Sequence, residues 1–306
     1  MAPVGHDHSH SVPAGGDQRW LGIALAITAV LVVVEVAAGL LTGSIALLSD
    51  AGHNVTDAAS IALALVAARL ALRPPSGGLT FGLRRTEILS AQVNGATLLV
   101  LAGVIAFESV GRLLDPPDIA AAPVIVVGVL GGAANGVAAW ALSRAARQSL
   151  NVRGAAQHVL ADLYGSGAAV VAGVAVLAFG FLAADPLAAL VVVGLMVHAG
   201  WGLLRDSGRV LLEAAPVGMD VDAVGRSMSA VTGVVEVHDL HVWEITSGFP
   251  ALSAHVLVVP GEDCHAARRT LESVLHDRFA LEHTTLQVDH APREAALLDI
   301  APLRPR

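Results

Sequence analysis

The sequence predicts an integral membrane protein, in which a membrane all-α bundle of six transmembrane helices precedes a small α+β domain. Hydrophobic residues make up 55% of the 306 residues, and mean hydropathy is +0.67. Charged residues make up only 14%, against about 25% in soluble domains. Six apolar segments are long enough to cross a bilayer, and after residue 210 shorter amphipathic and alternating patterns follow.

The polar start of the chain, residues 1–18, is expected to be a disordered cytoplasmic tail. Its one feature is the histidine-bearing run 6–10, and such a tract either binds metal weakly or is a neutral linker. We expect no cleavable signal peptide, because the first apolar run starts late and has no small-residue cleavage site at its end.

The expected spans lie within a membrane domain over residues 19–210. They cover about 20–42, 44–70, 88–111, 121–143, 154–183 and 186–206. Each reaches the roughly 20 residues that cross ~30 Å of hydrocarbon. Glycine and alanine are abundant in them, and small residues let membrane helices approach closely. A compact bundle is therefore expected.

The placement of arginine predicts how the bundle is oriented. The chain contains no lysine, so arginine supplies all 18 basic residues. Arginines precede the first span, fill the loops after the second and fourth spans and follow the sixth, whereas Arg112 stands alone on the opposite side. Because short cytoplasmic loops carry the positive excess, both termini are expected in the cytoplasm, with the spans in the cell (inner or plasma) membrane.

Composition also argues against several classes of function. Without lysine the chain can hold neither a Walker A loop nor a lysine Schiff base, so an ion gradient is the expected energy source. Cys264 is the single cysteine, which excludes an intramolecular disulfide and a cysteine-rich zinc module. The net charge of −8 argues against a nucleic-acid partner.

Two matched polar pairs lie inside the apolar spans. His53 and Asp57 stand in the second span, and His158 and Asp162 repeat the His-x-x-x-Asp spacing in the fifth. Residues four apart share one face of a helix, and an acidic group in hydrocarbon costs about 2.5–3.5 kcal/mol on insertion scales. One pair alone is as readily an ordinary helix contact. Two pairs together supply the four ligands of a tetrahedral zinc site.

The depth of the pairs is consistent with one shared ion. A rise of 1.5 Å per residue places His53 roughly 14 Å and Asp57 roughly 20 Å below the outer surface, with Asp162 roughly 14 Å above the inner one. In a layer of ~30 Å these positions fall in one zone. Asp50, one turn outward of His53, is either a helix-start carboxylate or an outer-side relay for the ion.

A cytoplasmic α+β domain is predicted over residues 211–292, with a tail over 293–306. Helices at 219–231 and 263–279 and strands at 234–245, 251–259 and 284–288 give the order αββαβ. That order fits helices packed on one face of a sheet. Its ligand candidates are His238, His255, His265 and Asp289, with Cys264, Gln287 and other histidines nearby. Any one of these is more often a surface residue than a ligand.

The chain resembles the cation diffusion facilitator family, in its zinc-transporting branch. The resemblance extends from about residue 19 to 290. It is carried by residues 44–53, Asp57, Phe81-Gly82 with Arg85 and Glu87, Asn94-Gly95, 151–154, His158 with Asp162, Asp185-Pro186 and 237–241. The resemblance implies a homodimer with six spans and a ferredoxin-like cytoplasmic domain in each subunit, which exports a divalent metal against protons.

The resemblance also implies roles for particular residues. The family's transport site is matched by His53, Asp57, His158 and Asp162. Positions that can bind further zinc at a cytoplasmic dimer interface are matched by His238, His255, His265 and Asp289. Gln287 stands where some members have histidine, and the loop over 73–85 lacks the histidines and carboxylates with which some members bind metal.

The expected function is therefore proton-coupled efflux of zinc by alternating access, with cadmium, cobalt and nickel as other cations that such ligands accept. Metal binds only neutral imidazole, so loading displaces protons. A membrane metalloenzyme would need an open zinc position, and a zinc-sensing scaffold would not need carboxylates in hydrocarbon. We expect a transporter and not an enzyme, with the metal ion, protons and the lipid bilayer as partners.

Overall fold

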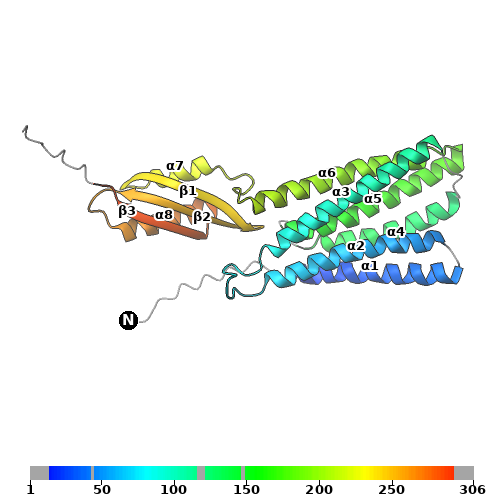
Figure 1. Ribbon diagram of the computed structural model, residues 1–306, viewed down its shortest axis with the longest axis horizontal. Coiled ribbons are helices and arrows are strands. Elements are labelled where there is room, and N and C mark those ends of the chain that lie inside the picture. Colours follow the sequence, from blue (N-terminus) through cyan, green and yellow to red (C-terminus); the bar gives the residue numbers. More distant parts are fainter. Residues whose placement is uncertain (1–13, 43–44, 116–120, 146–148, 293–306) are drawn as a thin grey trace, which may run out of the picture. The chain divides into compact units, whose positions relative to one another are not determined.

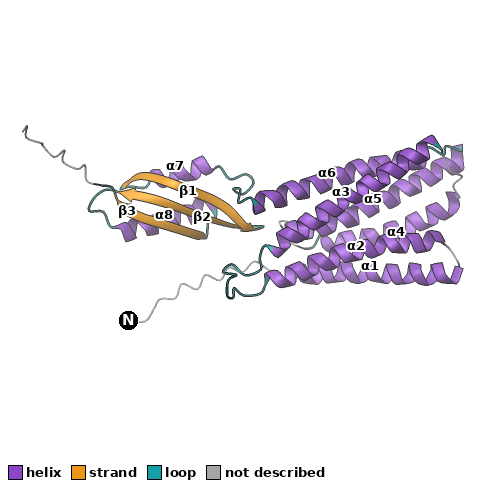
Figure 2. Cartoon of the chain, viewed as in Figure 1, coloured by secondary structure: helices purple, strands orange, loops and turns teal. Residues whose placement is uncertain are grey.

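The computed structural model describes residues 14–42, 45–115, 121–145 and 149–292. The chain divides into two compact units between residues 211 and 212. The first unit is a bundle of long helices and the second contains all the strands of the sheet, as Figure 2 shows by colour. Each unit is described below by itself.

The first unit contains the six predicted membrane helices. They are α1 (Ala14–Thr42), α2 (Ile45–Ala71), α3 (Thr86–Leu114), α4 (Ala121–Leu142), α5 (Leu150–Phe179) and α6 (Ala184–Leu211). All six are long and apolar enough to span a bilayer, which confirms the predicted bundle. They run side by side along its length (Figure 1), and the most extensive contacts join α3 to α6, α4 to α5 and α1 to α2.

The start of α1 differs from the sequence-based expectation. The helix begins at Ala14, so the expected tail over 1–18 is wrong for its last residues. In this extra turn the Gln18 side chain donates to the Ala68 carbonyl at 3.3 Å, and just after it Trp20 packs edge-on against Trp140 with ring centroids 5.9 Å apart. The histidine run at 6–10 and the tail over 293–306 lie outside the described residues.

Glycines allow the closest approach between helices. A Cβ atom on Gly95 of α3 would lie 2.9 Å from the Leu203 Cβ and 3.1 Å from the Gly200 carbonyl oxygen of α6. A Cβ on Gly200 would lie 2.9 Å from the Gly95 carbonyl oxygen. Backbone thus meets backbone at this crossing, as is typical of small residues in membrane bundles.

The second unit has the predicted αββαβ order. It consists of α7 (Val221–Ser229), β1 (Val234–Thr246), β2 (Phe249–Val258), α8 (Cys264–Phe279) and β3 (His283–His290). The sheet has the order β1-β2-β3, with β1 antiparallel and β3 parallel to β2. Val224 and Met228 of α7 share one buried cluster with Leu271 and Leu275 of α8 and with strand side chains. Both helices therefore cover the same face of the sheet.

Capping and a bulge shape the ends of these elements. Asp263 accepts hydrogen bonds from the backbone amides of His265 and Ala266 at the start of α8, and these bonds lower the pKa of its carboxyl. In β1 the register shifts between His238 and His241, and Asp239 adopts a left-handed backbone with φ of 49°. This bulge changes which side chains share a face of the sheet.

Candidate metal centre

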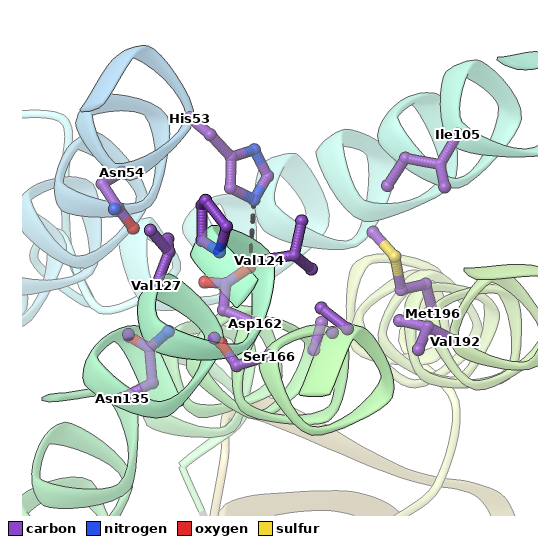
Figure 3. Close-up of a pocket in the computed structure, with 16 residues that line it drawn as sticks. His53, Asn54, Ile105, Val124, Val127, Asn135, Asp162, Ser166, Val192 and Met196 are labelled. Carbon is purple, nitrogen blue, oxygen red and sulfur yellow. Dashed lines mark hydrogen bonds and ion pairs between the residues drawn. The ribbon is translucent and has the colours of Figure 1, made fainter. Parts of the chain in front are cut away.

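The two His-x-x-x-Asp pairs of α2 and α5 meet inside the bundle. His53 Nε2 lies 3.1 Å from Asp162 Oδ1 and 3.7 Å from Asp57 Oδ2. His158 Nδ1 lies 3.8 Å from Asp57 Oδ1. Ligand atoms of His53, Asp57 and Asp162 all lie within 4.8 Å of one another, and Figure 3 shows His53 pointing from its helix toward Asp162. The structure thus gathers three of the four predicted ligands, and the fourth, His158, is outside that group but lies beside Asp57.

Burial leaves these carboxylates short of partners. Asp57 is 2% exposed and His158 is 1% exposed. Both oxygens of Asp57 and the Oδ2 atom of Asp162 are buried and accept no hydrogen bond from the described residues. Buried charge without donors is costly, and a cation held between the carboxylates removes that cost. Imidazole nitrogen with carboxylate oxygen is a donor set for zinc and its transition-metal neighbours.

A backbone carbonyl fixes the orientation of His158. Its Nε2 atom lies 3.2 Å from the Asn94 carbonyl oxygen of α3. A carbonyl only accepts, so the Nε2–H group donates and the lone pair of the neutral ring is at Nδ1, on the side of Asp57. This is the arrangement by which partners outside a metal site orient its ligands.

Sequence reasoning missed a buried partner of this centre, Glu35 of α1. The Asn54 amide donates to Glu35 Oε2 at 2.8 Å, and both residues are buried. Asn54 follows His53 directly, so this bond ties α1 to the part of α2 that carries the centre. Glu35 is the single acidic residue of the first apolar span. An acidic side chain in a membrane span was the sequence feature that could have identified this partner. The side chain of Asp50, the predicted relay, is outside the described part of the structure.

A cavity of about 530 Å³ opens beside His53 and Asp162. Its lining comes from α2 to α6 and includes Asn135 and Ser166 as well as apolar side chains such as Ile105 and Met196, which Figure 3 labels. All lining residues of α2, α4 and α6 lie in the first part of their helices or near the middle. The cavity therefore occupies the half of the bundle in which α2, α4 and α6 begin.

The opposite half is held together by polar contacts between helices. The Asn151 amide at the start of α5 donates to the Ala64 carbonyl of α2 at 2.7 Å. Arg153 pairs with Asp206 of α6, with 2.7 Å between Nη1 and Oδ2. Near this pair in sequence, the Ser207 hydroxyl donates to Gln92 Oε1 of α3 at 2.6 Å. These contacts join α2, α3, α5 and α6 at the arginine-rich end.

A second cluster lies in the αββαβ unit, where β1 pairs with β2. His238 stands opposite His255, with ring centroids 5.4 Å apart. Asp239 Oδ2 lies 3.5 Å from His255 Nδ1, and the ligand atoms of all three residues lie within 4.8 Å of one another. The predicted His265 and Asp289 are not in this group. Asp239 was missed because sequence does not reveal the bulge that brings it beside the histidines.

The two residues outside that cluster have other surroundings. His265 lies exposed in the first turn of α8. Asp289 accepts a hydrogen bond of 2.8 Å from the Gln287 amide, two residues earlier on β3. Gln287 pairs with His255 in the parallel register, whereas Asp289 pairs with Leu257. Asp289 thus lies two positions along the strand from the row of His238 and His255.

Six membrane helices that enclose a cluster of imidazoles and largely buried carboxylates are typical of secondary cation transporters. Comparison with known families agrees with this class. A family model described as the cation efflux transmembrane domain matches residues 21–212, and one described as the cation efflux protein, cytoplasmic domain, matches residues 216–291. The chain belongs to the cation efflux family, as the resemblance predicted, and this is a family of transporters and not of enzymes.

Curated relatives match over nearly the whole chain. A zinc transporter ZitB from Pectobacterium atrosepticum is 37% identical, over 94% of this chain and 89% of the relative. A cadmium, cobalt and zinc/H(+)-K(+) antiporter from Bacillus velezensis is 35% identical, over 94% and 93%. A cation efflux system protein CzcD from Alcaligenes sp. is 40% identical, over 96% and 93%.

Proposed function

We propose that this protein exports zinc from the cytoplasm in exchange for protons, and that the ion in transit binds His53, Asp57, His158 and Asp162. One observation carries the proposal: both oxygens of Asp57 and the Oδ2 atom of Asp162 are buried without a hydrogen-bond donor among the described residues, and the imidazoles of His53 and His158 lie beside these carboxylates. Relatives named as transporters of zinc, and of cadmium, cobalt and zinc, support zinc as the substrate with cadmium and cobalt as further cargo.

Histidine ligands give a physical reason for proton coupling. A metal ion binds the lone pair of neutral imidazole, so loading from the cytoplasm releases protons, and protonation on the outer side weakens the site. Two carboxylates neutralise a divalent cation in hydrocarbon. The relative named as a zinc/H(+)-K(+) antiporter supports the same coupling.

We assign the structure to the outward-facing conformation of an alternating-access cycle. The arginine-rich end, which we assign to the cytoplasm together with both termini, carries the Arg153–Asp206 pair and the Asn151 contact. The cavity beside the metal centre lies in the other half. An ion released from His53 and Asp162 in this state enters space that leads away from the cytoplasm.

The αββαβ unit is assigned two roles, dimerisation and binding of a second zinc ion. The match to the family's cytoplasmic domain supports a homodimer. Within one chain, His238, Asp239 and His255 are gathered for a structural or regulatory ion. The predicted ligands His265 and Asp289 stay candidates for such a site in the assembled dimer.

Zinc flux into proteoliposomes tests this function. We expect zinc uptake by the purified protein to follow an imposed pH gradient, and Asp57→Asn to slow it at least ~10-fold, because the isosteric amide removes one charge from a dehydrated ion. Asp277→Asn, at an exposed carboxylate of α8, is the matched control and should transport as the wild type does. Uptake that is indifferent to both the gradient and Asp57→Asn would refute the proposal.

A further inference from the structure

Two polar side chains on the cavity wall have no hydrogen-bond partner among the described residues. Asn135 of α4 is 7% exposed, and Ser166 of α5 is half-buried. Both line the cavity with His53 and Asp162. Neither side chain makes a hydrogen bond to another described residue, and neither is among the buried polar atoms without a partner, so their polar atoms are accessible from the cavity.

Both groups lie at the depth of the metal centre. A Cβ atom on Gly132 would lie 3.4 Å from the Ser166 Cβ, and one on Gly136 would lie 4.0 Å from the Leu163 Cδ1. Asn135 stands between these two glycines on α4 and is therefore level with the stretch of α5 from Asp162 to Ser166. Ser166 is one turn beyond Asp162 on the same face, about 6 Å further along the axis.

The rest of the wall offers few polar groups to a hydrated cation, because the amide of Asn54, which also lines the cavity, donates to Glu35. Ile105, Val127, Val192 and Met196 surround the same space with apolar side chains. An ion that leaves imidazole and carboxylate ligands must regain water, and water is held in a cavity where two to four polar partners are present. Asn135 and Ser166, beside Asp162, supply such partners at the point of release.

We propose that Asn135 and Ser166 bind water on the side of the metal centre that faces the cavity. This water rehydrates the divalent cation as it leaves its ligands and so speeds its release. The two side chains act on the hydrated ion through water and are not ligands of the bound, dehydrated ion. This role rests on the proposed export function. It predicts that removing the polar groups slows turnover and leaves the equilibrium affinity for zinc unchanged.

The test compares Asn135→Ala with Asn135→Ser in proteoliposomes, because these variants differ only in a hydroxyl group. Asn135→Ala and Ser166→Ala should each lower the kcat for zinc about 10-fold, the effect of one lost hydrogen bond near a charge. The Kd for zinc, measured by competition with a chromophoric chelator on the full-length protein, should stay within about 2-fold of wild type. Asn135→Ser should recover most of the flux. Val137→Ala, on the exposed face of α4, controls for insertion and folding.

Three outcomes would overturn the inference: Asn135→Ala transports as fast as wild type, Asn135→Ser is as slow as Asn135→Ala, or the zinc affinity falls as much as the turnover. The last result would make Asn135 a ligand of the bound ion. Failure of the wild type itself to move zinc would refute the export function and the inference together. Wild-type flux with an unaffected Asn135→Ala refutes the inference alone.

Discussion

Glu35 and Asn54 make a buried hydrogen bond next to the metal centre, and its two members can be tested separately. Glu35→Ala leaves the buried Asn54 amide without this acceptor, which should cost about 1–3 kcal/mol of stability. The backbone of the neighbouring His53 should also be held less firmly against α1. We expect a lower thermal unfolding midpoint in detergent and slower zinc flux.

Glu35→Gln is the matched variant, because a glutamine keeps an oxygen that accepts from Asn54. It should unfold close to the wild type. If Glu35→Gln and Glu35→Ala lower the unfolding midpoint equally, the charge of Glu35 and not its acceptor oxygen stabilises the protein.

At the residue scale, the His-x-x-x-Asp spacing predicted that each pair shares one helix face, because helical periodicity fixes which residues lie on a face. The structure brings His53, Asp57 and Asp162 together with His158 next to Asp57, and their role as ligands stays a prediction. Asn135 and Asp239 could not be found in this way. Asn135 lines the cavity beside the metal centre because α4 packs on α5, and Asp239 lies beside His238 and His255 because of a bulge in β1. The local pattern of one segment predicts neither which helix packs against it nor where a strand bulges.

The crossing of α3 and α6 is the element-scale feature that supports the centre. The Asn94 carbonyl that holds His158 lies next to Gly95, at the closest contact with α6. Gly95→Ala would put its Cβ 2.9 Å from the Leu203 Cβ, so the helices must separate. We expect a loss of about 1–3 kcal/mol in stability, as in other overpacked sites, together with weaker zinc binding.

Gly103→Ala on the same helix provides the control. A Cβ atom there meets nothing within 4 Å, and alanine is the better helix former. This variant should bind zinc and unfold as the wild type does. If Gly95→Ala behaves in the same way as Gly103→Ala, the close crossing of α3 and α6 does not position His158.

At the element scale, apolar length predicted all six membrane helices, and alternating patterns predicted the order αββαβ, because both signals depend on local sequence. The start of α1 was placed too late, since residues 14–18 are polar and small and read as a tail. Gln18 of that turn contacts α2, and Trp20 directly after it contacts α4. Tertiary packing of this kind has no signature in the segment itself.

The orientation of the whole molecule in the membrane can be tested with its single cysteine. Cys264 lies at the start of α8, in the unit that we assign to the cytoplasm. A membrane-impermeant maleimide should label it in inside-out vesicles and leave it unlabelled in intact right-side-out vesicles. Cys264→Ser provides the blank. Labelling from the outer side would reverse the topology derived from arginine placement and the direction of export with it.

The central claim is that α2 and α5 hold one dehydrated cation between their matched side chains. Anomalous diffraction at the zinc edge, from crystals of the full-length protein grown with zinc, tests it most directly. The account predicts a zinc peak about 2.0–2.2 Å from nitrogen or oxygen ligands of His53, Asp57, His158 and Asp162, and its loss in Asp57→Asn. A protein saturated with zinc that shows no peak between these two helices would contradict the account.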